Sequence, residues 1–442
     1  MKFIKNIFSL LACLCILAAC KKEKTESHNP GQPITIDKFI PEEGQGGTEM
    51  MIFGHNFSMD STEVEVFING MKAKITGINK ERILLIVPEN AGTGNVEVSI
   101  KGNKATSTTR FKFPPTYIWK VMTLAGSGTA GYANGAGTLA KFNFERAPGL
   151  DVDDEGNIYV ADAGNHTIRK ITPTGEVSTL AGNGSAGYVD GPAAEARFNT
   201  PFDVAVDNDK NIYVADTWNA KLRKITPDGL VSTVTGVGDV VSVAIDKRNN
   251  GVYVSSLTSG AVYKVENNGN LTAAIQGLQW VGGIAIDAKG VLYVVEVGRS
   301  VVRMVDLKSV GGSAGNPVLI AGIPDEMGLV DGAGTKAKFD RPWGIAVDFT
   351  NNNLLVAGDS GPYGGTWYGG ANSNQCIRLI KYDSWQVSTF AGNGERGNVN
   401  GTPSEARFSN PTGVVVDKSG NIYVVDAGNQ CIRKIYKEVV ND

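Results

Sequence analysis

The chain has 442 residues, of which 42% are hydrophobic and 20% charged, and its formal net charge is −3. This length exceeds one ordinary core, so we expect at least two domains. The slight negative charge supplies no basic field for a phosphate backbone, which excludes nucleic acid as an expected partner. With 55 glycines against 17 prolines, the composition indicates many tight turns, as short strands in an all-β protein require.

The first twenty residues have the pattern of an export signal. Lys2 and Lys5 precede a short apolar run that ends in the letters LAA directly before Cys20. This pattern resembles a bacterial lipoprotein signal over residues 1–20, which implies lipid on Cys20, a membrane anchor and a place in the cell envelope. We expect the outer membrane, with exposure on the cell surface left open. The alternative is a membrane-spanning helix, but that needs about 20 apolar residues and this run is shorter.

A tether and a small β domain follow the signal. Residues 21–33 are charged and contain no large apolar side chain, so they predict a flexible tether. Over residues 34–114, short alternating runs are separated by turn residues at the spacing of a β-sandwich. The letters GGTEMMIFGHNF at 46–57 and FING at 67–70 resemble the IPT/TIG immunoglobulin-like family. That resemblance implies a spacer or docking module.

The remaining chain, residues 117–442, repeats one unit six times. Each copy begins with a short apolar strand ending in Asp, and the best copies continue with NIYVAD or NIYVVD, an Asn three residues later, and IRKI. These phrases, at 157–165 and 421–429, resemble NHL repeats, and four short strands a copy predict a six-bladed β-propeller. The sixth copy lacks its fourth strand, but residues 120–126 match that strand of the first copy. We therefore expect the N-terminal strand to close the ring, since an open sheet edge invites aggregation.

Loop lengths predict which face of the propeller binds. The loops leading into the first strands are long at 125–142, 181–198, 321–339 and 391–408, whereas the turns on the opposite face are minimal. Binding residues usually collect where loops vary. Although the long loops contain Gly-x-Gly sequences, no helix follows them as a phosphate loop requires, so we interpret them as turns.

Aromatic side chains on this face are the candidate ligand-binding residues. In the alignment of the repeats, Phe202 and Trp343 share one position near the predicted channel mouth, and Trp280 lies two residues before it. Flat rings among glycines suit stacking on sugars or clasping a peptide, while the alternative is that these rings plug the channel. Asp203 replaces the Gly of most copies and is a candidate polar contact. The full candidate set is Trp343, Phe202, Asp203, Trp218, Trp280, Tyr363, Trp367, Tyr368, His166 and Arg341.

Catalysis is the less favoured function. Related propellers include lyases and hydrolases that use histidines, but His166 is the one histidine of the predicted propeller, so a multi-histidine zinc site is excluded. The repeated Asp162 and Arg169 recur at fixed repeat positions, which favours a structural role. No cofactor is predicted, although Ca²⁺ in the channel is left open because oxygen ligands have no recognisable spacing.

We therefore expect an envelope lipoprotein that binds carbohydrate through the long-loop face. An analogy with glycan-capture lipoproteins favours sugar over the alternatives. Those alternatives are a scaffold that docks an envelope protein, and a hydrolase or lyase with a divalent ion in the channel.

Overall fold

The computed structural model describes residues 28–309, 315–358 and 375–440. The predicted signal peptide with Cys20 and the candidate residues Tyr363, Trp367 and Tyr368 lie outside these ranges. One compact unit comprises residues up to Tyr117 and those from Val439, and a second runs from Ile118 to Glu438. In the described ranges every regular element is a strand or a short 3-10 helix, and no helix there is long and apolar enough to cross a membrane.

The first unit is a sandwich of two four-stranded sheets. Its strands alternate between buried and exposed residues, as in β2, where Met50 and Ile52 are buried and Glu49 is exposed. Because side chains along a strand alternate between the two faces, one face of each sheet lies in a shared core. The predicted immunoglobulin-like sandwich is confirmed. The sheet orders are β1-β2-β6-β5 and β4-β3-β7-β8, with β1 Thr35–Ile40, β2 Glu49–His55, β3 Val64–Ile68, β4 Met71–Lys72, β5 Lys74–Ile78, β6 Arg82–Ile86, β7 Gly94–Ile100 and β8 Asn103–Phe111.

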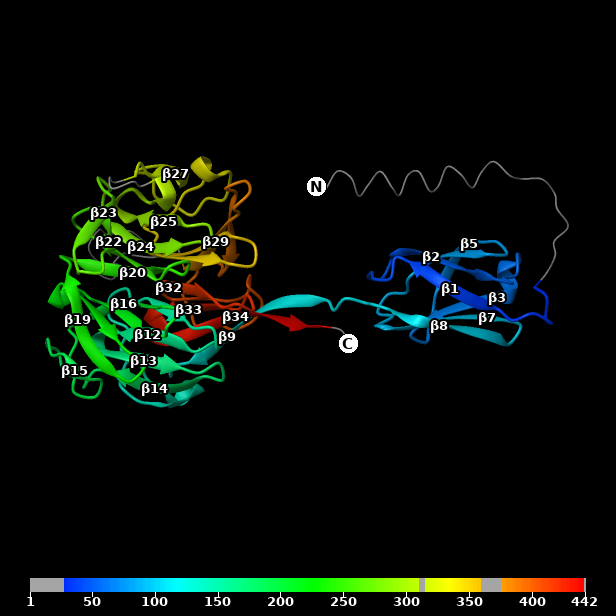
Figure 1. Cartoon of the computed structure of the whole chain (residues 1–442), viewed down its shortest axis with the longest axis horizontal. Coiled ribbons are helices and arrows are strands. Elements are labelled where there is room, and N and C mark those ends of the chain that lie inside the picture. The colour runs from blue at the N-terminus through cyan, green and yellow to red at the C-terminus, as the bar shows by residue number, and fades with distance from the viewer. Residues whose placement is uncertain (1–27, 310–314, 359–374, 441–442) are drawn as a thin grey trace. The chain divides into compact units, whose positions relative to one another are not determined.

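The described residues of the second unit form six antiparallel sheets, the blades of a propeller (Figure 1). Blade 1 contains β10 Gly135–Ala136, β11 Leu150–Val152, β12 Ile158–Asp162, β13 Thr167–Ile171 and β14 Glu176–Ala181. Blade 2 contains β15 Gly191–Pro192, β16 Pro201–Val206, β17 Ile212–Asp216, β18 Lys221–Ile225 and β19 Leu230–Gly236. Blade 3 contains β20 Val240–Asp246, β21 Gly251–Ser256, β22 Ala261–Val265 and β23 Leu271–Ile275. Blade 4 contains β24 Val281–Ile286, β25 Val291–Glu296, β26 Val301–Asp306 and β27 Val318–Ala321. Blade 5 contains β28 Gly344–Asp348, β29 Asn353–Gly358, β30 Cys376–Ile380 and β31 Val387–Ala391. Blade 6 contains β32 Pro411–Val416, β33 Ile422–Asp426, β34 Cys431–Val439 and β9 Tyr117–Ala125.

Single-turn 3-10 helices occupy several of the loops. Four of them, η3, η4, η5 and η9, follow the second strand of a blade. The set described is η1 Ser61–Glu63, η2 Gly137–Leu139, η3 Ala163–Asn165, η4 Thr217–Asn219, η5 Val297–Arg299, η6 Leu307–Ser309, η7 Gly334–Lys336 and η9 Ala427–Asn429.

An early strand closes the ring, as the sequence predicts. β9 pairs with β34 as the outermost strand of blade 6, and Figure 1 shows the two side by side. The ring is thereby fastened without a covalent bond, and β34 is not left as a free edge.

Buried ion pairs hold the long loops. Arg169 and Asp162 are fully buried and lie 2.7 Å apart, and Arg169 also donates to the backbone oxygens of Lys141 and Ala133 in the loop leading into blade 1. Arg223 with Asp216 and Arg433 with Asp426 repeat the arrangement. The structural role expected for these recurring pairs is confirmed.

The turns on the opposite face are closed by a different carboxylate. Asp153 accepts hydrogen bonds from the backbone N–H groups of Glu155 and Asn157 and from the hydroxyl of Tyr159. Asp417 makes the same set of bonds in blade 6. This side-chain closure keeps the turns short, so we call this side the short-turn face and the other the long-loop face.

Candidate functional site

The six innermost strands enclose a cavity of about 500 Å³ along the propeller axis. Its wall is mostly glycine, alanine and branched aliphatic side chains, because the first strands of the blades are apolar runs packed between neighbouring blades. The wall strands are β11, β16, β20, β24, β28 and β32. Concave sites of this size and polarity are typical of small-molecule binding.

Two of the candidate aromatics close one end of this cavity. Trp343 and Phe202 are 4% and 3% exposed, and both belong to a buried cluster with Ala147 and Val241. The indole nitrogen of Trp343 donates to the carbonyl oxygen of Ala147 at 3.2 Å. The two rings therefore form the floor of the cavity, which agrees with the alternative that they plug the channel, and they do not form an exposed surface on the long-loop face.

The cavity opens at the short-turn face. Its lining there continues through exposed residues that directly follow the first strands, among them Asp154, Asn208, Lys247, Phe349 and Lys418. The Phe349 side chain is 50% exposed. The cavity mouth thus lies on the face opposite to the long loops.

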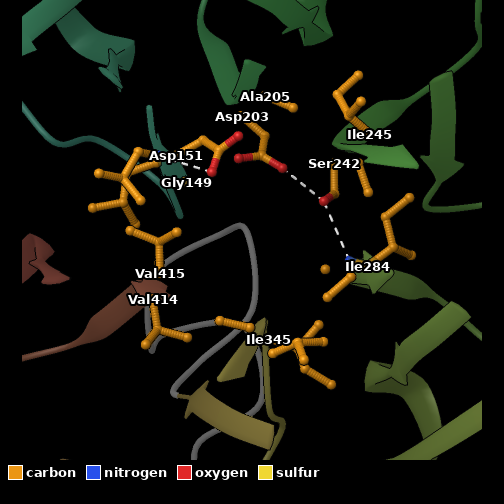
Figure 2. A pocket seen from close by; sticks show the side chains of 18 of the residues that line it. Gly149, Asp151, Asp203, Ala205, Ser242, Ile245, Ile284, Ile345, Val414 and Val415 are labelled. Carbon is orange, nitrogen blue, oxygen red and sulfur yellow. Dashed lines mark hydrogen bonds between the residues drawn. The ribbon is translucent and has the colours of Figure 1, made fainter. Parts of the chain in front are cut away.

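Two carboxylates interrupt the apolar wall. Asp151 on β11 and Asp203 on β16 lie side by side on one wall, with aliphatic side chains around the rest (Figure 2). Asp203 accepts hydrogen bonds from the Ser242 hydroxyl at 2.6 Å and from the backbone N–H of Val243 at 3.0 Å. Asp151 accepts from the backbone N–H of Val206 at 2.8 Å. Each carboxylate therefore bridges its own blade to the next one.

Burial and mutual repulsion disfavour the charged forms of this pair. Burial raises the pKa of Asp203 to about 7, and the neighbouring charge of Asp151 acts in the same direction. Burial also raises the pKa of Asp151, which Lys247 opposes. Two carboxyl groups close together in an apolar wall do not readily ionise at once.

Gly149 gives the carboxylate of Asp203 its space. A Cβ added at Gly149 would lie 1.9 Å from an oxygen of Asp203. In the repeat alignment these two residues share one column, so the glycine of blade 1 accommodates the aspartate of blade 2.

The structure places other candidate residues on the long-loop face. Trp218, in η4 of blade 2, is 56% exposed, and the guanidinium of Arg146 lies 5.4 Å from its ring centre. Trp280, in the loop leading into blade 4, is 46% exposed. Blade 3 lies between these two positions. The loops leading into blades 3 and 4 are short, since β20 begins four residues after β19 ends and β24 begins six after β23 ends.

His166 and Arg341 are engaged in contacts between blades. The ring nitrogen Nδ1 of His166 accepts a hydrogen bond from the backbone N–H of Thr200 at 3.1 Å. Gln430 and Gln375 occupy the same repeat position, and their side-chain oxygens also accept from the backbone of the next blade. Arg341 donates its backbone N–H to the Ser300 hydroxyl of blade 4 at 3.2 Å.

The described residues contain no group of three or more His, Cys, Asp and Glu side chains that could hold a metal ion. The two thiols of the propeller, Cys376 and Cys431, are buried, and burial raises the pKa of Cys376 to about 12. A thiol with so high a pKa is a poor nucleophile at neutral pH. Besides Asp151 and Asp203, the lining of the cavity includes Asp153, Asp287 and Asp417 at the ends of first strands.

Sequence reasoning selected Asp203 but missed Asp151. The signal was present in the alignment, because Asp151 stands where the other copies have Ala205, Ala244, Ala285, Ala346 and Val415. A charged residue at a position that is otherwise small and apolar marks a departure from the repeat. Ser242 departs from the glycine column in the same way.

Family models match both units. Residues 33–113 match the IPT/TIG domain, and residues 144–171 and 408–435 match the NHL repeat. The chain carries an IPT/TIG domain and NHL repeats. NHL repeat-containing protein 2 from Gallus gallus is 28% identical over 347 residues, which cover 64% of this chain and 45% of that protein. The chain thus spans less than half the length of this relative.

Solved structures share the fold of the IPT/TIG and NHL regions. An auxiliary nutrient binding protein from Bacteroides ovatus has a TM-score of 0.57 at 23% identity and covers 93% of this chain and 100% of its own. A second one, from Bacteroides thetaiotaomicron, has a TM-score of 0.58 at 21% identity and covers 93% and 99%. A protein of unknown function from B. thetaiotaomicron has a TM-score of 0.60 at 19% identity, covering 93% and 100%. At these identities the similarity establishes the fold.

Proposed function

We propose that this chain is a binding protein of the cell envelope that captures carbohydrate on the long-loop face of its NHL propeller. The observation that carries the proposal is the exposure of two indole rings, Trp218 and Trp280, on either side of blade 3. An exposed indole offers a ligand a flat apolar face with a polar rim. A sugar ring offers the flat apolar face that stacks on indole, and its hydroxyls need polar groups at the rim.

The cation beside Trp218 suits a ligand that is rich in oxygen acceptors. The guanidinium of Arg146 lies over the Trp218 ring. Guanidinium groups donate hydrogen bonds to hydroxyl and carboxylate oxygens alike. The loops leading into blades 3 and 4 are short, and we infer that an extended chain of sugars crosses the face there from one tryptophan to the other.

Two further considerations support this proposal. The names of two fold neighbours describe auxiliary nutrient binding proteins. The signal-like N-terminus with Cys20 gives this chain the anchor that surface capture of a nutrient needs. Mass spectrometry of the membrane-extracted chain tests the anchor, since the proposal requires lipid on Cys20 and loss of membrane retention in Cys20→Ser.

Affinity electrophoresis of the purified soluble chain against a panel of polysaccharides tests the ligand. We expect retardation by at least one glycan, and about tenfold weaker binding in Trp218→Ala and in Trp280→Ala, the loss expected for one stacked ring. Tyr188→Ala is the matched control, because Tyr188 is 51% exposed but its hydroxyl bonds Thr233 on the outer strand of blade 2.

Unchanged migration across the whole panel contradicts carbohydrate capture. If the same protein then recovers one membrane protein in stoichiometric amount, and the two tryptophan variants lose it, the long-loop face is a protein-docking surface instead. Equal weakening by Tyr188→Ala would show that the effect of the tryptophan variants is not specific to their position.

A further inference from the structure

We propose that the axial cavity is a second binding site, which takes a small organic amine with an apolar body through the short-turn face. This site is separate from the glycan surface proposed above, because the buried floor formed by Trp343 and Phe202 lies between the cavity and the long-loop face. The cavity of about 500 Å³ is large enough for a compact organic molecule.

The wall selects for an apolar body. Gly, Ala, Val and Ile residues from the innermost strands of all six blades line the cavity, and the aromatic rings of the floor add flat apolar area. Small residues such as Ala285 and Val415 remain partly accessible in the channel. Moving apolar ligand surface from water to this wall favours binding.

The two carboxylates select for the polar end of the ligand. Asp151 and Asp203 lie beside one another, so an ammonium group placed between them donates to both and neutralises their repulsion (Figure 2). The carboxylates can accept further hydrogen bonds from a ligand. A carboxylate offers about four lone-pair sites, and Asp151 accepts two of the hydrogen bonds described, from the backbone N–H groups of Val152 and Val206. A divalent cation fits less well, because two carboxylates supply fewer oxygens than the six or more that Ca²⁺ takes.

The cationic side chains at the mouth do not repel such a ligand strongly. Lys418 pairs with Asp154 at 2.8 Å, and Arg248 pairs with Asp246 at 2.6 Å. The ammonium of Lys247 donates to the carbonyl oxygen of Val206. Two of these three cations are therefore balanced by carboxylates, and the charge of Lys247 acts on Asp151. An ammonium group between Asp151 and Asp203 adds a positive charge at the place where the two carboxyl groups disfavour each other's ionisation.

Calorimetric titration of the full soluble chain tests the proposal with matched probes. We use cyclohexylamine, benzylamine, phenethylamine and 1-adamantylamine, each beside the alcohol of the same carbon skeleton. We expect at least one amine to bind about tenfold or more tightly than its alcohol. Asp151→Asn and Asp203→Asn should each reduce that preference about tenfold, whereas Asp228→Asn, an exposed carboxylate on a turn of the same face, should not.

A steric variant covers the case in which the carboxylate variants do not fold. Ala285→Phe fills the cavity from β24, so it should abolish binding of the amine while leaving glycan retardation unchanged. Absence of binding by all four amines, equal affinity for amine and alcohol, or full binding by Ala285→Phe overturns the proposal. If the protein binds an amine but no glycan, the proposed function is contradicted and the amine site is not. The two proposals can therefore fail separately.

Discussion

The indole nitrogen of Trp343, in the loop leading into blade 5, lies 3.2 Å from the carbonyl oxygen of Ala147, in the loop leading into blade 1, so one side chain joins two non-adjacent blades and residues 196 positions apart. With Phe202 it makes the channel a cavity with one mouth. The closed end separates the two faces, and each face can therefore carry its own ligand.

Trp343→Ala should destabilise the propeller and open the channel at both ends. The change leaves a large void in a buried cluster and removes one hydrogen bond, which together cost about 3 to 5 kcal/mol. Trp343→Phe keeps most of the ring volume and should cost less. Denaturant unfolding followed by far-ultraviolet circular dichroism measures both. Equal stability of Trp343→Ala and the parent protein would contradict the role of this ring as a plug.

Gly149 and Asp203 should be coupled in a double-mutant cycle. Gly149→Ala places a Cβ against the Asp203 carboxylate, so it should lower the free energy of unfolding by about 2 kcal/mol or more. In the background of Asp203→Gly, the residue found at this position in most blades, the same change should be much less costly. Additive effects of the two changes would show that the carboxylate does not occupy the space beside Gly149.

Asp203 should make stability fall as the pH rises. Its pKa is about 7 in the folded chain and near 3.8 when unfolded, so between these values the native state binds more protons and the free energy of unfolding decreases with pH. The charge of Asp151 also raises the pKa of Asp203, while Lys247 lowers and Asp153 raises the pKa of Asp151. Asp203→Asn removes this titration. The melting temperature of the variant minus that of the parent protein should therefore increase by about 5 °C between about pH 5 and about pH 8.

The control for this titration is Asp228→Asn. Asp228 is exposed and its pKa is lowered from the usual value by a hydrogen bond from Thr226, so it does not titrate in that range. The melting temperature of Asp228→Asn should change with pH in the same way as that of the parent protein. Differential scanning calorimetry at several pH values measures all three proteins, and a constant difference between Asp203→Asn and the parent would rule out a raised pKa for Asp203.

His166 should tolerate glutamine but not alanine. The repeat places Gln375 and Gln430 at the same position, where each side chain accepts a backbone hydrogen bond from the next blade. His166→Gln keeps a side-chain acceptor for the N–H of Thr200. His166→Ala removes this acceptor and should lower the free energy of unfolding by about 1 kcal/mol. Thermal unfolding of both variants compares them. If both were equally destabilised, the ring itself rather than its acceptor nitrogen would matter.

Much of the fold could be predicted from local patterns. The first strand ending in Asp recurs six times, and the NIYVAD or NIYVVD phrase follows it in three copies, because each blade must meet its two neighbours in the same way. The missing fourth strand of the last copy and its match near residue 120 predicted the closure by β9. Buried pairs such as Asp162 with Arg169 were recognisable as structural for the same reason, since a feature present in many blades serves the blade rather than one ligand.

The sequence by itself determined the IPT/TIG sandwich, the six blades and the face on which the long loops gather, because strand alternation and repeat register are local properties of the chain. Only the tertiary structure decided that the cavity opens on the opposite face, and that Asp151 and Asp203 meet in its wall. The alignment gives the position of Trp343 just before its strand, but whether its ring packs against Ala147 depends on the residues that other blades present there. That packing is set by residues far apart in the chain, and no local pattern contains it.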